Sequence, residues 1–409
     1  MTGSTLRHAR VGLYALMLSA AGIPLYIHLP QFATVHLGLG LSGLGVLLLA
    51  IRLVDLLQDP LIGWAIDRWP RAQAAFALAA ALGLAVGFPA LFLMEPGPAL
   101  MARLVAVLVL LFTAYSLGTI LLYARSATLA DSPEPPALMR LAAWREGGTL
   151  AGVILAAMLP GLLAALGATA AGYPAFGLAL GALCLAVAGL TLPLWRRPPL
   201  PSAPLSIRGM GEAGAVRLLV LALVNSLPVA ITSTLFLFFV EDRLQAQGMA
   251  GPLLVLFFAS AGISLPVWAR ISRRIGARGT LFLSMSLALA GFVGAALLGP
   301  GDVAPFAAIC IATGAAMGAE AMLLPALFSV ALTRAGLNPA LAFGIWTFAG
   351  KLGLALAAFL VMPLLQWQGY EPGQANSPDA LTALGLTYAA LPCLLKLAAL
   401  AMVARLPRD

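Results

Sequence analysis

Charged side chains are scarce in this sequence, and their scarcity argues against a soluble fold. Asp, Glu, Lys and Arg make up 9% of the 409 residues, whereas a soluble domain carries about 25%. Apolar residues make up 62% of the chain, and the mean hydropathy is +1.00. A soluble fold of this length has no room to bury so much apolar surface, so the composition indicates a protein dissolved in a lipid bilayer.

Cysteines are few, and common enzyme motifs are missing. The three cysteines, Cys184, Cys310 and Cys393, lie in apolar runs, and no two have the spacing of a metal or redox site. We interpret them as small side chains that fill space in the core. The sequence has no G-x-S-x-G nucleophile motif, no P-loop and no H-E-x-x-H zinc motif. We therefore expect neither an enzyme nor a bound cofactor.

Long apolar runs, in contrast, are abundant. A spanning helix needs about 20 predominantly apolar residues. The first run follows a basic start without a break, so we read it as a transmembrane helix and not as a cleaved signal. The twelve predicted helices lie near residues 11–36, 42–66, 72–94, 99–128, 142–167, 171–195, 214–240, 250–270, 279–299, 303–333, 340–367 and 381–404.

Basic residues gather in alternate connections between these helices. The other connections are nearly free of them, and the loop 368–380 has none. The positive-inside rule therefore places both termini in the cytoplasm of a bacterial inner-membrane protein. The net charge of +8 is a topology signal, and we expect no nucleic-acid partner. The basic set comprises Arg7, Arg10, Arg68, Arg71, Arg140, Arg196, Arg197, Arg208, Arg270, Arg273, Arg274, Arg278, Arg334, Arg405 and Arg408.

One long polar linker divides the chain. Residues 196–213 are rich in Pro, Ser and Gly, and they separate an N-terminal six-helix half, 1–195, from a C-terminal six-helix half, 214–409. Two six-helix halves around a central cavity resemble the major facilitator transporters. We predict an all-α membrane protein with twelve transmembrane helices and the major facilitator fold.

The second predicted helix carries three charges on one face. Arg52, Asp55 and Asp59 are spaced i, i+3, i+7. An ionised group in the hydrocarbon costs at least ~2.5–3.5 kcal/mol, so this face must meet a cavity or a partner. Two carboxylates one turn apart are stable if a cation lies between them, if one is protonated, or if Arg52 neutralises one. The pattern indicates a coupling-cation site to which Gln58 adds an oxygen; the alternative is a structural ion pair.

This motif resembles that of a known family. R-x-x-D-x-x-x-D-P-x-x-G, formed by Arg52, Asp55, Asp59, Pro60 and Gly63, resembles the second-helix signature of the glycoside–pentoside–hexuronide:cation symporters, the melibiose-permease family. The resemblance implies that the two aspartates bind Na⁺ or H⁺.

Three further positions fit the resemblance. Tyr115-Ser116 is similar to the family's Tyr-Thr pair, which implies Ser116 as a cation ligand. Arg145 lies where the family has a substrate-side arginine, and Lys351, one of only two lysines, matches its lone lysine in the eleventh helix. The resemblance implies that these two bases, with Arg52, bind substrate or link it to the cation.

Two short basic turns resemble the cytoplasmic gating turns of major facilitators. G-x-x-x-D-R-x-x-R follows the charged motif, and residues 266–279 match its counterpart in the second half. Such turns are common and carry no information on substrate. The resemblance assigns gating to Gly63, Asp67, Arg68, Arg71, Arg273 and Arg274.

The acids that bind sugar in this family are missing here. No acid occurs between residues 14 and 27, and the family's acid or amide in the fourth helix would fall near Gly118 or Thr119. Paired carboxylates and amides bind the hydroxyl groups of a sugar, and these residues are missing. The residues implied in cation binding are therefore retained better than those implied in sugar binding. We expect a less polar substrate, or an organic anion attracted by Arg145 and Lys351.

Four other residues are candidates for a role in transport, and two of them carry two interpretations each. Glu320, deep in a predicted helix, is either a proton carrier or substrate contact, or the partner of a nearby base. His28 is either a substrate or proton-sensing group or a packed interface histidine. Glu146 reads as the charge partner of Arg145, and Trp346 as a cavity-lining residue.

Together these features predict a secondary active transporter that couples Na⁺ or H⁺ to symport of a small solute by alternating access. Asp55 and Asp59, helped by Ser116 and Gln58, would bind the cation, which is a metal ion in the sodium-coupled case. We expect a monomer whose partners are the solute and the bilayer. Three alternatives stay open: a lysolipid or lipid symporter on the same scaffold, a proton-driven exporter, and a transport-inactive sensor.

Overall fold

The computed structural model describes the chain as a set of long helices. The described residues are 3–22, 24–29, 32–33, 36–39, 41–165, 172–198, 200, 203–370 and 376–406. Within them no β-strand occurs, and one isolated bridge pairs Ala203 with Leu337. Each predicted span overlaps a described helix, although residues 23, 30–31, 34–35, 166–167 and 171 of these spans lie outside the described residues. Eight of the described helices are long and apolar enough to cross a membrane. The all-α membrane fold is therefore confirmed.

The chain forms two compact units. The first comprises Met1–Met210 and Ser329–Phe348, and the second comprises Gly211–Phe328 and Ala349–Asp409. The segment 329–348 thus groups with the N-terminal helices, although it lies in the predicted C-terminal half. Backbone hydrogen bonds contribute to this grouping, because Ala203 donates to Gly336 and accepts from Asn338. The division at the linker 196–213 stays a prediction.

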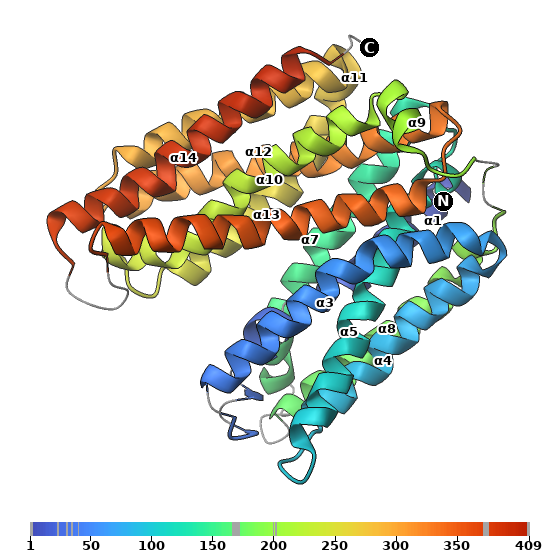
Figure 1. Cartoon of the computed structure of the whole chain (residues 1–409), viewed down its shortest axis with the longest axis horizontal. Helices are drawn as coiled ribbons and strands as arrows, with labels where there is room; N and C mark the ends of the chain where they lie inside the picture. The colour runs from blue at the N-terminus through green and yellow to red at the C-terminus, as the bar shows by residue number, and fades with distance from the viewer. Residues whose placement is uncertain are drawn as a thin grey trace. The chain divides into compact units, whose positions relative to one another are not determined.

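The first unit is a bundle in which α3, α4, α5 and α8 lie side by side (Figure 1). α1 packs against α7 in the same unit. Its helices are α1 (Gly3–Ala20), η1 (Pro24–His28), α3 (Leu41–Arg68), η2 (Pro70–Ala72), α4 (Gln73–Phe92), α5 (Leu100–Ala124), α6 (Ser126–Leu129), α7 (Pro135–Ala165) and α8 (Gly172–Trp195).

Small residues let the helices of this bundle approach closely. A Cβ atom on Gly148 of α7 would lie 2.0 Å from the carbonyl oxygen of Gly12 in α1, and one on Gly181 of α8 would lie 2.7 Å from that of Ala85 in α4. Backbone contact of this kind is typical of membrane helices, which gain little from hydrophobic burial against each other.

The second unit contains the remaining long helices. α12 and α13 each contribute one end to the first unit and the rest to the second. A short helix, α9 (Ile207–Glu212), precedes them in the linker. The others are α10 (Ala215–Phe238), η4 (Phe239–Arg243), α11 (Ala250–Ala296), α12 (Val303–Arg334), α13 (Pro339–Trp367) and α14 (Pro378–Ala404).

α11 covers two predicted spans because its break is a single residue. Gly276 has φ 74° and ψ 171° inside the 47-residue element. This conformation lies in the region that favours glycine. The break falls between the predicted spans 250–270 and 279–299, so two helices join end to end without an intervening loop.

Candidate functional site

The polar face of α3 is buried although the helix is mainly apolar. Asp55 and Asp59 are 1% and 0% exposed, whereas Leu53 and Leu57 are 53% and 66% exposed. The two aspartates lie one turn apart on the same face. α3 therefore turns its leucines outward and its carboxylates inward, as a charged helix in lipid requires.

α5 supplies hydroxyl groups next to these carboxylates. Ser116 Oγ donates a hydrogen bond to Asp55 Oδ1 at 3.0 Å, and Gln58 Nε2 donates to the same oxygen at 3.1 Å. Thr113 Oγ1 in turn donates to Gln58 Oε1 at 2.8 Å. Carboxylate, amide and hydroxyl oxygens thus lie close together, and such oxygen ligands suit a hard cation.

The sequence pattern did not single out Thr113. It precedes Ser116 by three residues and so shares its face of α5, which is the signal that would have found it. Among the described residues, no group of three or more His, Cys, Asp or Glu side chains lies close enough to hold a metal ion. A sodium ion at Asp55 would therefore depend on neutral oxygens for most of its ligands. The side chain of Arg52 lies outside the described part of the structure.

Two glycines bring α3 into backbone contact with the start of α13. A Cβ atom on Gly63 would lie 2.4 Å from the carbonyl oxygen of Ala340, and one on Gly344 would lie 2.5 Å from that of Asp59. Neither position accepts a side chain without separating the helices. The contact therefore begins at the turn of Asp59 and extends to the end of α3.

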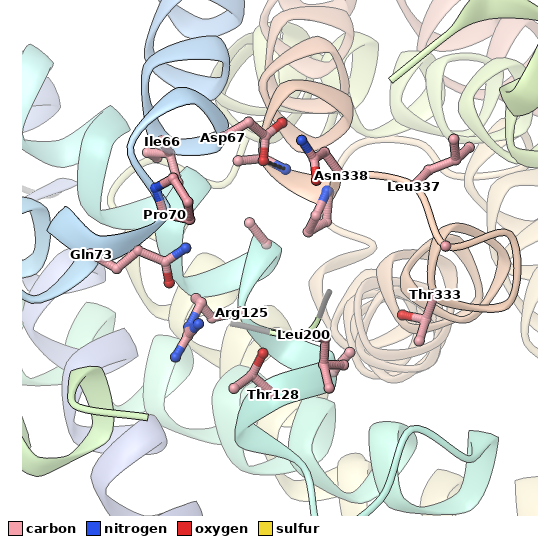
Figure 2. A pocket seen from close by; sticks show the side chains of 15 residues that line it. Ile66, Asp67, Pro70, Gln73, Arg125, Thr128, Leu200, Thr333, Leu337 and Asn338 are labelled. Carbon is pink, nitrogen blue, oxygen red and sulfur yellow. Dashed lines mark hydrogen bonds between the residues drawn. The ribbon is translucent and has the colours of Figure 1, made fainter. Parts of the chain in front are cut away.

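Asp67 closes the same contact by capping α13. Its carboxylate accepts hydrogen bonds from the backbone N–H groups of Ala340 at 3.1 Å and Leu341 at 2.8 Å. The first N–H groups of a helix lack intrahelical partners and carry partial positive charge, so a carboxylate stabilises them. Burial raises the pKa of Asp67, and the two hydrogen bonds oppose that shift. Figure 2 shows Asp67 beside Asn338, in the turn before α13.

Arg145 is held by neighbours in the first unit. Its Nε donates to Glu146 Oε1 at 2.9 Å, and its Nη1 donates to Ser126 Oγ at 3.3 Å. The guanidinium carbon lies 3.8 Å from the centre of the Tyr123 ring, whose hydroxyl donates to the same Glu146 oxygen at 3.2 Å. The two charges are buried and paired, and Nη2 is the one guanidinium nitrogen of Arg145 without a hydrogen-bond partner within the described residues.

A second buried ion pair lies in the second unit. Lys396 Nζ donates to Glu320 Oε2 at 2.5 Å and to Asn225 Oδ1 at 2.7 Å. Asn225 Nδ2 donates to the same Glu320 oxygen at 2.9 Å. Glu320 thus has a base as its partner, which is one of its two interpretations. The resemblance drew attention to Lys351 instead; a lysine inside the apolar run 381–404 was the signal for Lys396.

The remaining predicted residues have less specific surroundings. His28 packs edge-on against Phe176, with 4.9 Å between ring centres, and so belongs to an aromatic cluster. Thr119, Trp346 and Lys351 are half-buried. The four arginines predicted to take part in gating are exposed, namely Arg68, Arg71, Arg273 and Arg274.

Comparison with known proteins agrees with this fold. The chain matches the family described as MFS/sugar transport protein over residues 10–409. A bacterial homologue of the iron transporter ferroportin, solved in an outward-facing state, is similar with a TM-score of 0.72 and 15% identity, over 98% of this chain and 100% of that chain. The MFS transporter FucP in the outward conformation has a TM-score of 0.69 and 14% identity, over 98% and 99%. A search of curated proteins gives no match.

A second structure of FucP, described as the E. coli fucose:proton symporter, has the same TM-score of 0.69, with 15% identity over 98% of each chain. At these identities the likeness concerns the fold alone. The family match is broader evidence, since it covers nearly the whole chain. The protein is thus a multi-pass membrane transporter and not an enzyme. The chain belongs to the major facilitator superfamily, in the family described as MFS/sugar transport protein.

Proposed function

We propose that this transporter is a cation-coupled symporter of the glycoside–pentoside–hexuronide type, which takes up a small solute with Na⁺ or H⁺. In this proposal Asp55 and Asp59 bind the cation, with help from Ser116 and Gln58. The protein acts as a monomer in the bacterial inner membrane, with both termini in the cytoplasm.

One observation supports the proposal most directly: Asp55 is buried in the predicted second span and accepts hydrogen bonds from two side chains. An ionised carboxylate buried in a membrane helix is costly unless a cation, a proton or hydrogen-bond donors compensate its charge, and such residues are usually functional. Ser116, on α5, donates a hydrogen bond to Asp55 Oδ1, which also accepts one from Gln58 on α3. Helices α3 and α5 therefore both contribute to the proposed cation site. Asp59 lies one turn farther along α3, at the Gly344 contact with α13. A cation bound here would therefore affect the packing of α13 directly.

Coupling follows from the cost of a buried charge. Cation and solute must bind together before the protein changes state, because an uncompensated carboxylate resists closure in a low dielectric. The solute is either glycoside-like or an organic anion. Arg145 Nε already donates to Glu146, whereas its Nη2 has no hydrogen-bond partner within the described residues and is the donor that an anion would use. Lys351 and Thr119 complete the proposed substrate side.

The test is gradient-driven uptake into liposomes that contain the purified protein. A thermal-shift screen with sugars, glycosides, organic anions and lysolipids, with and without Na⁺, first identifies a solute, since a ligand that binds only the native state stabilises it. We expect Asp55→Asn and Asp59→Asn to abolish accumulation driven by a Na⁺ or H⁺ gradient. Solute binding should persist in both variants, because the change removes charge and keeps shape.

Asp379→Asn is the matched control, because Asp379 is exposed in the first turn of α14. It should accumulate solute like the unmodified protein. Normal accumulation in Asp59→Asn would rule out the cation assignment. Protection by lysolipids alone would favour the lipid symporter, and solute efflux driven by a proton gradient would favour the exporter.

A further inference from the structure

A cavity of about 340 Å³ lies beside the Asp67 cap in the first unit. Its walls come from four segments that are distant in sequence. They are the turn between α3 and α4, residues 124–128 where α5 passes into α6, Leu200 in the linker, and the turn between α12 and α13. Its described lining residues include none of the polar side chains around Asp55. The proposed cation site therefore does not account for it.

Arg125 is the charged group that this cavity leaves without full pairing. The residue is 2% exposed, and its Nη2 donates to the carbonyl oxygen of Arg197 at 2.5 Å. Neither its Nε nor its Nη1 has a hydrogen-bond partner within the described protein. A guanidinium stays charged at any physiological pH. Buried N–H donors of a charged group are costly when they are unpaired, so the cavity favours a ligand that accepts hydrogen bonds.

A second unpaired group lies on the same wall. Gln73 is 8% exposed, and its Oε1 has no hydrogen-bond partner within the described protein. Figure 2 shows Gln73 and Arg125 on one side of the cavity, with Thr333 on the other. An acceptor beside a cation requires a ligand that offers both acceptor oxygens and an O–H or N–H donor.

The charge around the cavity favours an anion. The guanidinium of Arg197 donates to the carbonyl oxygen of Thr128, one of the lining residues, at 3.2 Å. Arg197 does not line the cavity, but it brings a second positive charge next to the wall that carries Arg125, and both charges attract an anion in the cavity. Asp67 also lines the cavity, but both of its oxygens already accept backbone N–H groups of α13. It therefore offers little to a cation that entered the cavity.

We infer that this cavity is a binding site for a phosphate group, as inorganic phosphate, a phosphate monoester or a lipid headgroup. A partly protonated phosphate supplies acceptor oxygens for Arg125 and an O–H donor for Gln73. A carboxylate or chloride lacks that donor. Arginine is also well suited to phosphate, because its planar N–H groups match the oxygens. The cavity volume leaves room for the group attached to a monoester.

Occupation of the site also has a structural consequence. The phosphate would touch the wall formed by α4 and residues 124–128 on one side and the turn before α13 on the other. The same turn is attached to α3 by Asp67 and by Gly63. A bound phosphate therefore stabilises the arrangement in which α3 and α13 touch, and it slows any step of transport that separates them.

The test measures thermal unfolding of the purified full-length protein. One arm titrates inorganic phosphate against sodium chloride at matched ionic strength in detergent. A second arm compares nanodiscs of phosphatidylcholine with nanodiscs that contain phosphatidic acid. We expect phosphate to raise Tm in a saturable way, and Arg125→Gln to weaken its binding by at least about tenfold, the loss expected for a charge-assisted hydrogen bond. Protection in the second arm alone would assign the phosphate group to a lipid.

Arg217→Gln is the matched control, since it removes the same charge from an exposed position at the start of α10. It should respond to phosphate like the unmodified protein. If Arg125→Gln does not fold, Gln73→Glu decides, because a carboxylate on that wall should repel phosphate. No rise of Tm in either arm, or an equal rise in the variants that alter the wall, would overturn the inference and leave a cavity that only water fills.

Discussion

Two buried bases of the described residues, Arg145 and Lys396, are each paired with an acid, and the pairing decides what their substitution costs. Lys396 and Glu320 neutralise each other in the second unit, with Asn225 bonded to both. Glu320 Oε1 has no further partner within the described residues. The pair is therefore held by one carboxylate oxygen, which receives two donors, and loss of the lysine would remove most of its compensation.

Replacement of Lys396 should be rescued by replacement of its partner. Lys396→Met leaves a buried carboxylate without its counter-charge, for which we expect a loss of about 3–5 kcal/mol of stability. The double variant Lys396→Met/Glu320→Gln should regain most of that loss, because an uncharged pair needs no compensation. Thermal unfolding of the single and double variants in detergent measures the coupling. Lys351→Met, at a half-buried lysine, is the control and should lose less.

Additive losses in the double variant would contradict the pairing. Such a result would mean that Glu320 and Lys396 stabilise the protein through separate contacts.

For single residues, the sequence shows which charges lie in apolar segments and therefore need a partner. It is less able to show which residue that partner is. Asp55, Gln58 and Ser116 do lie together, because the i, i+3 pattern fixes two of them on one helix face and the resemblance adds the third. Lys396 was overlooked because its pairing with Glu320 depends on how α14 is rotated against α12, and hydropathy alone does not report rotation. Arg145 shows the reverse case, since its partner Glu146 is adjacent in sequence and was predicted.

Among elements, close packing depends on single glycines. Gly147 and Gly148 are neighbours on α7, yet only the second faces α1. A Cβ atom on Gly148 would lie 2.0 Å from the carbonyl oxygen of Gly12, whereas nothing lies within 4 Å of one on Gly147. The obstacle at Gly148 is backbone, so no side-chain movement can relieve it.

Gly148→Ala should therefore destabilise the protein while Gly147→Ala does not. We expect the first to cost at least about 1–3 kcal/mol, since α1 and α7 must separate. The second should be neutral or stabilise by up to about 1 kcal/mol, because alanine is the better helix former. Tm values in one detergent, measured side by side, give the comparison. Equal values would show that α1 and α7 do not touch at this position.

The elements themselves were predictable because hydropathy adds up along a helix, whatever the helix packs against. The same reasoning could not join two predicted spans at Gly276, since a break in one residue leaves no polar loop to read. The same reasoning could not find the contact of α3 with α13. Gly63 and Gly344 are required by the backbone of the opposite helix, and hydropathy does not show which helices face each other.

For the whole molecule, composition predicted the class of protein and not the grouping of its parts. The segment 329–348 joins the first unit through the linker at Ala203 and through the cap at Asp67. Contacts between distant segments set that grouping, and they leave no periodic signal in sequence. Orientation in the membrane, in contrast, rests on a count of arginines in connections and can be tested without any knowledge of contacts.

Cysteine labelling tests this orientation with two matched positions. Glu95, in the connection between α4 and α5, and Glu212, in the linker 196–213, are both exposed acids. The arginine distribution places Glu95 outside the cell and Glu212 in the cytoplasm. In a background where alanine replaces the three native cysteines, we expect a membrane-impermeant maleimide to label Glu95→Cys on intact cells. Glu212→Cys should react only after the membrane is permeabilised. The opposite pattern would invert the topology, and it would move the Asp67 cap and the phosphate cavity to the outer face, where cytoplasmic phosphate esters could not reach them.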